Sequence, residues 1–394
     1  MAARLSTSGI LGNAGRVAGP DDATVRSAGL RLDGAPLPVL GTARIYTCGI
    51  TPYDVTHLGH AATFVWADVL TSVLGAVGAE VVSSRNVTDV DDVLTRAAES
   101  RGRHYDEFAL SQEFLFERDM QALRVHRPTL APRARHHVGS VQQLAAALLA
   151  AGAAYERDGA VYFRGAGVAG AAGLERDRAL ELAAAFGDDP TDPRKDDPFD
   201  VPVWRPSGEA DPAWPSPWGW GRPGWHAECA AMAAATLGLT VDVLVGGEDL
   251  AFPHHAYQAA MVEAAAGVTP FARRRLHVGA VRRDGVKLAK STGNLILVAD
   301  LLESHPPAAV RLLLLDRPWQ AAWDVEPRQL DAAAARLERL YAAAARGTAD
   351  GGPAAVEAVT AALLADLDVP AALDVAEEAG GDAARLALSV LNLS

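Results

Sequence analysis

Apolar and polar positions near the start of the chain predict a strand, a loop and a helix. A short β-prone run at 43–47 precedes a polar loop, and a long apolar-rich segment follows at 61–74. A second apolar, β-branched run lies at 80–84. Strand, helix and strand within about forty residues form a βαβ unit, which implies parallel pairing and a right-handed crossover. The loop at 48–60 therefore lies where such units bind nucleotides.

The rest of the pattern alternates helices with strands and then becomes helical. We expect helices, by residue range, at 93–125 (mostly helical), 137–151, 225–237, 254–265 and from Pro306 to the end. We expect strands at about 30–32, 160–164, 241–245 and 276–281. Residues 165–223 are rich in Pro, Gly and Asp, which predicts an insertion packed onto the main fold.

Composition excludes several classes of protein. The 394 residues are 49% hydrophobic and 22% charged, which is typical of a globular protein with more than one packing unit. A net charge of -13 makes a large nucleic-acid footprint improbable, because phosphate backbones are repelled. Two cysteines do not form a secreted disulfide scaffold, and no apolar run is long enough to span a bilayer. We expect a cytoplasmic protein.

Cys48, Cys229 and His254 are candidate metal ligands, because each lies near an expected junction of strand and helix. Thiolate and imidazole suit Zn²⁺. The alternative is that both cysteines are small core residues and His254 is a buried, hydrogen-bonded histidine, and composition alone favours that alternative. The polar sequence around Cys229, WHAEC at 225–229, is a poor core sequence and favours the metal.

Two further stretches carry candidate phosphate ligands. His57 and His60 are three residues apart, on one face if the segment is helical, and Gly59 between them allows close approach of a ligand. Lys287 and Lys290 lie in a loop and supply two ammonium groups for the charge that builds on a leaving pyrophosphate. Each signal alone is weak, because histidine pairs and surface lysine pairs are common.

A third stretch, GGED at 246–249, follows the expected strand at 241–245. Paired glycines at the end of a strand allow a flat base to approach, and Asp249 can accept ribose hydroxyls. A simple tight turn is the equal alternative for these four residues.

Taken together and in order, these stretches resemble the class I aminoacyl-tRNA synthetases. HLGH at 57–60 matches the HIGH motif, and KLAKS at 287–291 matches the KMSKS motif with Leu and Ala substituted. Within that class the chain is similar to the cysteinyl branch, through Cys48, NVTDVDD at 86–92, WHAEC at 225–229 and FPHH at 252–255. The resemblance covers residues 43–345.

The resemblance implies an α/β fold with a Rossmann-like parallel sheet of the class I aminoacyl-tRNA synthetase type. It also implies an inserted connective subdomain and a C-terminal helical bundle. The domains expected from it are an N-terminal arm (1–40), a Rossmann-like catalytic domain (41–126 and 222–282), the connective subdomain (127–221), a KMSKS-loop and stem region (283–325) and a helical domain (326–394).

Two families share these motifs: the cysteinyl-tRNA synthetases and the mycothiol ligases, which join cysteine to glucosaminyl-inositol in mycothiol biosynthesis. Residues 49–54 (GITPYD) and 214–219 (WPSPWG) are similar to the corresponding motifs of the ligases. Only 103 residues follow Ser291, which is short for the anticodon-reading region of a synthetase. The sequence therefore favours an ATP-dependent, AMP-forming ligase that transfers cysteine to a sugar amine.

The resemblance also implies roles for individual residues. Gln258 stands where synthetases have a fourth, glutamate zinc ligand, so we expect one Zn²⁺ on three protein ligands, with substrate thiolate or water in the fourth position. ATP, with Mg²⁺, would bind the following residues: Gly49, His57, His60, Gly247, Asp249, Val281, Lys287 and Lys290. His57, His60, Lys287 and Lys290 would act in catalysis. Thr51, Thr88 and Trp225 would enclose the backbone of the amino acid. Asp89, Asp91 and Asp92 are candidates for orienting the amine, and a solvated acidic turn is the equal alternative for these three residues.

The expected partners are L-cysteine, ATP and glucosaminyl-inositol or another small amine. We expect no tRNA, no membrane and a monomer. Three alternatives stay open: a cysteine ligase for a different amine in natural-product biosynthesis, a cysteinyl-tRNA synthetase, and a synthetase-like regulator without turnover. The altered KLAKS loop is the feature that favours a regulator.

Overall fold

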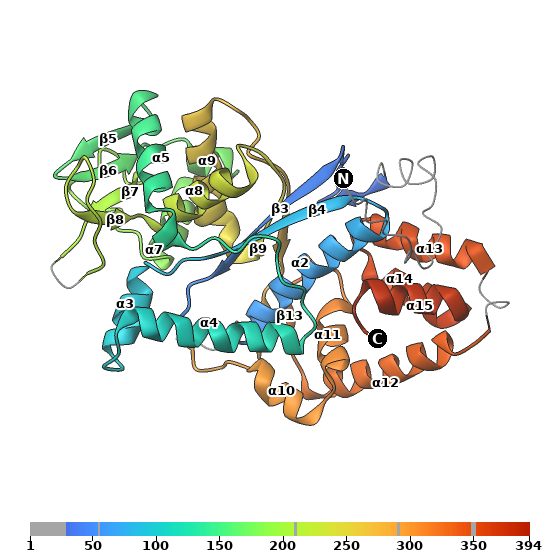
Figure 1. The fold of residues 1–394 in the computed structure, drawn as a ribbon. Helices are drawn as coiled ribbons and strands as arrows, with labels where there is room; N and C mark the ends of the chain where they lie inside the picture. Colours follow the sequence, from blue (N-terminus) through green and yellow to red (C-terminus); the bar gives the residue numbers. More distant parts are fainter. Residues whose placement is uncertain (1–28, 54–55, 209–210, 290–291, 348–351) are drawn as a thin grey trace, which may run out of the picture.

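A parallel four-stranded sheet lies at the centre of the computed structural model, in the strand order β10-β9-β3-β4 (Figure 1). The structure describes residues 29–53, 56–208, 211–289, 292–347 and 352–394. The strands are β3 (Thr42–Ile50), β4 (Glu80–Val87), β9 (Val241–Gly247) and β10 (Ala272–Val278). All three pairings are parallel, as the βαβ pattern predicts.

The two faces of the sheet bury different cores, because side chains alternate along each strand. In β3, Ile45 joins a core with helix α2 (Leu58–Ala76), whereas Tyr46 joins a core with helix α8 (Trp225–Leu237). The expectation that no apolar run could span a bilayer was wrong by length and composition, because the described helix α2 is long and apolar enough. However, 72% of its apolar window is buried inside the protein. That burial identifies α2 as a core helix.

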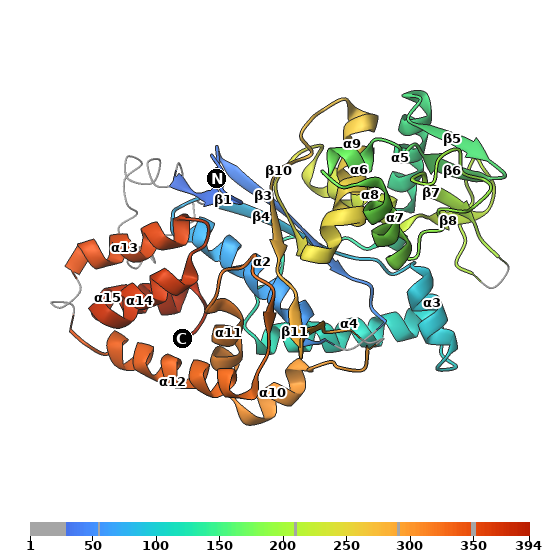
Figure 2. The ribbon, with the colours of Figure 1, turned by 180° about the vertical axis from the view of Figure 1, so that it is seen from behind.

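The region between β4 and α8 has an antiparallel sheet of its own, in the order β5-β6-β7-β8. Its strands are β5 (Ala154–Arg157), β6 (Ala160–Phe163), β7 (Val201–Pro206) and β8 (Gly221–Pro223). The helices before and within it are α3 (Asp92–Glu99), α4 (Tyr105–Ala122), α5 (Val138–Ala150), α6 (Val168–Ala171) and α7 (Arg176–Ala185). This sheet packs with α8 and with α9 (Ala256–Ala266), on one side of the central sheet (Figures 1 and 2).

The C-terminal part is helical and lies on the other side of the central sheet, with α2 (Figure 2). Its helices are α10 (Val298–Ser304), α11 (Pro307–Leu315), α12 (Pro327–Ala344), α13 (Gly352–Leu364), α14 (Val369–Ala379) and α15 (Gly381–Val390). A short hairpin, β1 (Arg31–Leu32) and β2 (Ala35–Pro36), precedes the sheet.

Three local expectations were wrong. The strand expected at 276–281 is two strands, because β10 ends at Val278 and β11 (Val281–Arg283) belongs to a separate small sheet. Lys287 lies in β12 (Val286–Lys287) of that sheet, not in a loop. The segment after Pro306 is not helical throughout, because β13 (Trp323–Asp324) pairs with β11. β11 and β12 form a local hairpin around Asp284 and Gly285, whereas β13 is fixed by non-local pairing with β11. Strands of two or three residues are too short for periodicity to report.

A buried ion pair joins α2 to the C-terminal helices. Arg311 of α11 is 0% exposed, and its guanidinium contacts the carboxylate of Asp68 on α2. Arg311 also donates to the backbone oxygen of Leu391 at 2.6 Å and of Leu123 at 3.1 Å. His126 and Asn392 complete the partners of Asp68. The helix that begins at the HLGH stretch is therefore tied to the end of the chain.

Candidate active site

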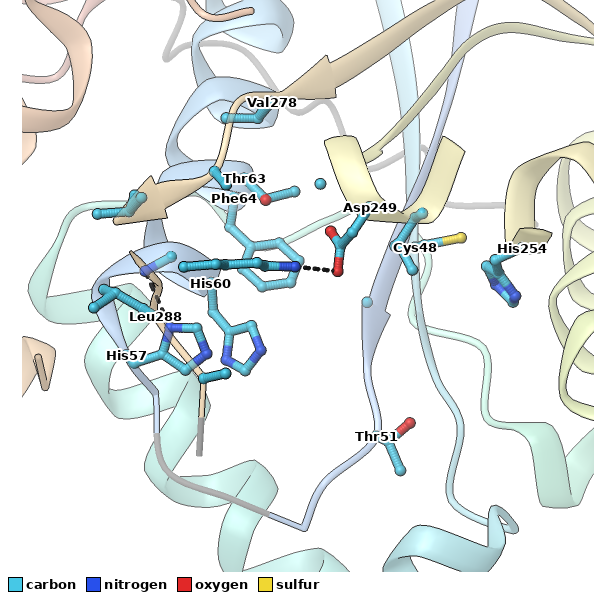
Figure 3. Close-up of a pocket in the computed structure, with 18 of the residues that line it drawn as sticks. Cys48, Thr51, His57, His60, Thr63, Phe64, Asp249, His254, Val278 and Leu288 are labelled. Carbon is cyan, nitrogen blue, oxygen red and sulfur yellow. Dashed lines mark hydrogen bonds and ion pairs between the residues drawn. The ribbon is translucent and has the colours of Figure 1, made fainter. Parts of the chain in front are cut away.

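A cavity of about 610 Å³ opens at the carboxyl ends of the central strands. This edge of a parallel sheet is where α/β proteins bind ligands. Nearly all of the predicted site residues line it: Cys48, Gly49, Thr51, His57, His60, Thr88, Trp225, Cys229, Gly247, Asp249, His254, Val281 and Lys287. The fold therefore brings the separate sequence motifs into one space (Figure 3).

Cys48, Cys229 and His254 form a buried group at one end of this cavity. Their ligand atoms all lie within 4.8 Å of one another, and Figure 3 shows the Cys48 sulfur directed toward His254. Cys48 lies in β3, Cys229 in α8 and His254 in the wide helical turn before α9, so only folding brings them together. Two sulfurs and an imidazole are a donor set that suits a soft or borderline metal.

The surroundings of His254 prepare its imidazole as a ligand. Its Nδ1 lies 2.8 Å from Nδ1 of His226, which leaves Nε2 for the cavity side. The indole of Trp225 stacks on the His254 ring at a centroid distance of 3.9 Å. Burial lowers the pKa of His254 well below its usual value, so the ring stays neutral, which is the form that binds metals.

Two amide side chains contact the cysteines. The side-chain oxygen of Gln258 accepts a hydrogen bond from the Cys48 thiol at 3.6 Å. The side-chain nitrogen of Gln258 donates to the backbone oxygen of Cys229 at 3.2 Å. Asn86 donates to the Cys229 sulfur at 3.3 Å. Burial, followed by contact with Cys48, raises the pKa of the Cys229 thiol well above its usual value. A cation in the group would offset that cost, since metals bind the thiolate.

The two histidines of the HLGH stretch lie at the start of α2. The rings of His57 and His60 stack at a centroid distance of 3.8 Å, and His57 Nδ1 accepts a hydrogen bond from Gly59 N at 3.1 Å. A side chain on Gly59 would place its Cβ 2.9 Å from the His57 ring, so the ring would have to move to accommodate it. Burial, then His60 and Lys287, lowers the pKa of His57 to about 3. His57 is therefore neutral and carries its proton on Nε2, as a donor.

Lys287 and Asp249 face each other across the cavity. The Lys287 Nζ lies 2.5 Å from Asp249 Oδ2, the contact marked in Figure 3, and both side chains are partly exposed. Gly247 lies beside Asp249, where an added Cβ would come within 2.6 Å of the carboxylate. Lys290, the second lysine of the KLAKS stretch, lies outside the described residues.

The remaining predicted residues fall into two sets. Thr51 and Thr88 line the cavity with their hydroxyl oxygens 2.6 Å apart. Asp89, in contrast, is fully buried, at 0% exposure, and its carboxylate forms ion pairs with Arg133 and Arg135. Among the described residues it is not one of those that line the cavity. Its predicted contact with the amine thus has no support from this arrangement.

The other two acidic candidates also have partners within the protein. The Asp91 carboxylate caps α3 by accepting from Val93 N at 2.7 Å. Asp92 pairs with Arg205 and Arg222, which come from the β5–β8 sheet. The acidic run therefore joins the two sheets, a function that sequence spacing did not indicate.

The sequence missed several lining residues. Asn86, Thr63, Phe64 and Leu288 line the cavity, yet none of them received a predicted function. Thr63 was within reach of prediction, because it lies three residues after His60 on the same face of α2. Asn86 begins the NVTDVDD stretch that supports the resemblance, but its contacts with two distant segments could not be predicted from that stretch.

Fold and site define a class I synthetase-type catalytic domain. Residues 39–335 match the family of class I (C) tRNA synthetase catalytic domains. The Mycobacterium tuberculosis methionyl-tRNA synthetase bound by methionyl-adenylate is similar at a TM-score of 0.62 and 15% identity, over 89% of this chain and 84% of that one. The Agrobacterium radiobacter K84 agnB2 LeuRS, solved with tRNA and LeuAMS, has a TM-score of 0.62 at 12% identity, over 90% and 84%. These likenesses show the fold.

Proteins of similar sequence identify the family within this class. The L-cysteine:1D-myo-inositol 2-amino-2-deoxy-alpha-D-glucopyranoside ligase of Kribbella flavida is 42% identical over 349 residues, 87% of this chain and 86% of that protein. The ligases of the same name from Nocardiopsis dassonvillei and Mycobacterium ulcerans are 43% and 42% identical, over 84% and 86% of this chain and 82% and 84% of theirs. The chain belongs to this ligase family, as the resemblance indicated.

Proposed function

We propose that the protein activates L-cysteine with ATP and transfers the cysteinyl group to the amine of glucosaminyl-inositol, the ligation step of mycothiol biosynthesis. The observation that carries the proposal is one cavity that holds both a buried Cys/Cys/His group and the residues of the HLGH and KLAKS stretches. An amino acid with a thiol at one end and a reactive carboxylate at the other would span these two parts. Membership of the ligase family supports the same reaction.

Cys48, Cys229 and His254 would hold one Zn²⁺. Bound there, the ion would take the substrate sulfur as thiolate and disfavour the harder, less acidic hydroxyl of serine. Cys48 and Cys229 lie on different elements, and the side chain of Gln258 is hydrogen-bonded to both residues. The group is therefore positioned before substrate enters. Thr51, Thr88 and Trp225, which line the adjacent wall, would enclose the backbone of the amino acid.

The other end of the cavity would stabilise the triphosphate. The cysteine carboxylate would attack the α-phosphate of ATP, with pyrophosphate as the leaving group. A Mg²⁺ ion bound with ATP would offset part of the phosphate charge. His57 Nδ1 accepts from Gly59 N, so its ring would present the Nε2 side to the phosphates as a hydrogen-bond donor. Lys287, and Lys290 beyond the described residues, would neutralise the charge that develops on pyrophosphate. Gly49, Gly247, Asp249 and Val281 would hold the adenosine.

The amine then attacks the carbonyl of cysteinyl-adenylate, which forms an amide and releases AMP. In the test, purified protein is incubated with ATP, cysteine and either glucosaminyl-inositol or tRNA, and AMP release is followed. AMP release that occurs with the amino sugar as acceptor and not with tRNA would support the ligase. Cysteinylation of tRNA without turnover of the amino sugar would refute it, and absence of cysteine-dependent ATP–pyrophosphate exchange would refute activation.

A further inference from the structure

The strand that carries Cys48 is irregular at that cysteine. The parallel register of β3 with β4 shifts between Thr47 and Ile50, so Cys48 and Gly49 fall in the break. The N–H of Gly49 donates to the side-chain oxygen of Asn86 at 2.9 Å. A Cβ on Gly49 would lie 1.8 Å from the backbone oxygen of Asn86, so the two segments are as close as glycine permits. Asn86 therefore supports the break that presents Cys48.

The other end of the same amide reaches the second cysteine. The Asn86 nitrogen Nδ2 lies 3.3 Å from the sulfur of Cys229, and the side chain is buried, at 1% exposure. The backbone N–H of Gly49 can only donate, so the amide oxygen must face Gly49 and the NH₂ group must face the sulfur. A sulfur that faces an N–H must accept the hydrogen bond, and a thiolate accepts it better than a thiol does. The orientation of Asn86 thus directs a hydrogen-bond donor at the Cys229 sulfur.

We infer that Asn86 is a positioning residue for the metal group, one side chain that fixes Cys48 and Cys229 relative to each other. This inference rests on the proposed function, because it assumes that the group binds Zn²⁺. Hydrogen bonds to ligand atoms orient the ligands and tune the metal, and their loss typically lowers metal affinity roughly 10- to 100-fold. The N–H bond also withdraws charge from the Cys229 sulfur, which leaves the ion a better acceptor for the substrate thiolate.

The experiment compares Asn86→Ala and Asn86→Asp with the parent protein. Alanine removes both hydrogen bonds, whereas aspartate keeps an acceptor for Gly49 N–H and loses the donor to Cys229. Ser84→Ala is the matched control, because Ser84 lies on the same strand at 0% exposure and bonds Thr236 at 3.4 Å, away from the cysteines. Zinc affinity is measured by competition with a chelator, and the sulfur-to-metal charge-transfer band is recorded with Co²⁺ in place of zinc.

Both Asn86 variants should bind zinc roughly 10- to 100-fold more weakly. Their Co²⁺ charge-transfer band should move to longer wavelength, because the sulfur lone pair loses its hydrogen bond. Ser84→Ala should match the parent in both measurements. Parental zinc affinity and band position in the Asn86 variants would overturn the inference and leave the proposed function intact. If the parent itself bound no zinc, the metal assignment would fail instead. If Asn86→Ala did not fold, as judged by urea unfolding, Asn86→Asp alone would decide.

Discussion

The contact between Lys287 and Asp249 predicts that substitution of the lysine changes mainly kcat, whereas substitution of the aspartate changes mainly KM for ATP. Asp249 would bind the ribose and Lys287 the leaving pyrophosphate, yet they are paired with each other at 2.5 Å before ATP enters. ATP must then replace the lysine at Asp249. In Lys287→Met the carboxylate is free, so binding of the ribose no longer competes with an ion pair.

The magnitudes follow from exposure and from the charge involved. The two side chains are 46% and 39% exposed, and an ion pair so exposed contributes about 0–1 kcal/mol. Its removal should therefore lower KM for ATP by at most about fivefold. Loss of one preorganised group that stabilises transition-state charge costs roughly 100- to 1000-fold in kcat. We expect Lys287→Met to show that fall in kcat, with KM for ATP unchanged or lower.

The assay is cysteine-dependent ATP–pyrophosphate exchange over a range of ATP concentrations. Asp249→Asn is the matched variant and should show the opposite separation. In this variant the ribose hydroxyls lose their hydrogen bonds to a charged carboxylate, which contribute about 1.5–3 kcal/mol. KM for ATP should therefore rise about 10- to 100-fold with little change in kcat. The reasoning would be refuted if Lys287→Met raised KM for ATP tenfold or more and left kcat unchanged, since the lysine would then bind the ground state.

Three further predictions concern metal, stability and pH. Cys48→Ala should lose bound zinc and, with it, the discrimination of cysteine from serine, measured by metal analysis and by exchange with each amino acid. Arg311→Met should lower the free energy of unfolding in urea by about 3–5 kcal/mol, because it leaves the Asp68 carboxylate buried without its partner. Burial lowers the pKa of His277 to about 4 from a usual 6.5, so the unfolded state binds more protons below pH 6.5. Stability from this group is present above pH 6.5 and is lost as pH falls, and His277→Gln should reduce the loss between pH 7 and pH 5 by about 2 kcal/mol.

Each of these predictions has a result that contradicts it. Zinc and full cysteine selectivity retained in Cys48→Ala would exclude the metal assignment. A change below about 1 kcal/mol for Arg311→Met would mean that Asp68 is compensated by its other partners, His126 and Asn392. An unchanged pH dependence in His277→Gln would place the acid sensitivity in other buried histidines, such as His255.

Much of the fold and most of the site could be predicted from sequence. The βαβ unit was predicted because β3, α2 and β4 are long and strongly patterned, and the parallel sheet confirms it. The ligase family was indicated by motif wording and is confirmed by the relatives. The domain boundaries and the roles of individual residues stay predictions. Short strands such as β12 and β13 were missed, since two residues carry no periodicity of their own.

The sequence by itself determined which chemical groups this protein carries. Cys48 and His57 were identifiable because each lies in a local motif whose residue types limit the chemistry. Tertiary structure decided how those groups are used. It placed Cys229 and His254 beside Cys48, and it placed Asp89 in ion pairs outside the described cavity lining. The physical reason is that burial and hydrogen-bond partners depend on distant segments, which local sequence does not encode.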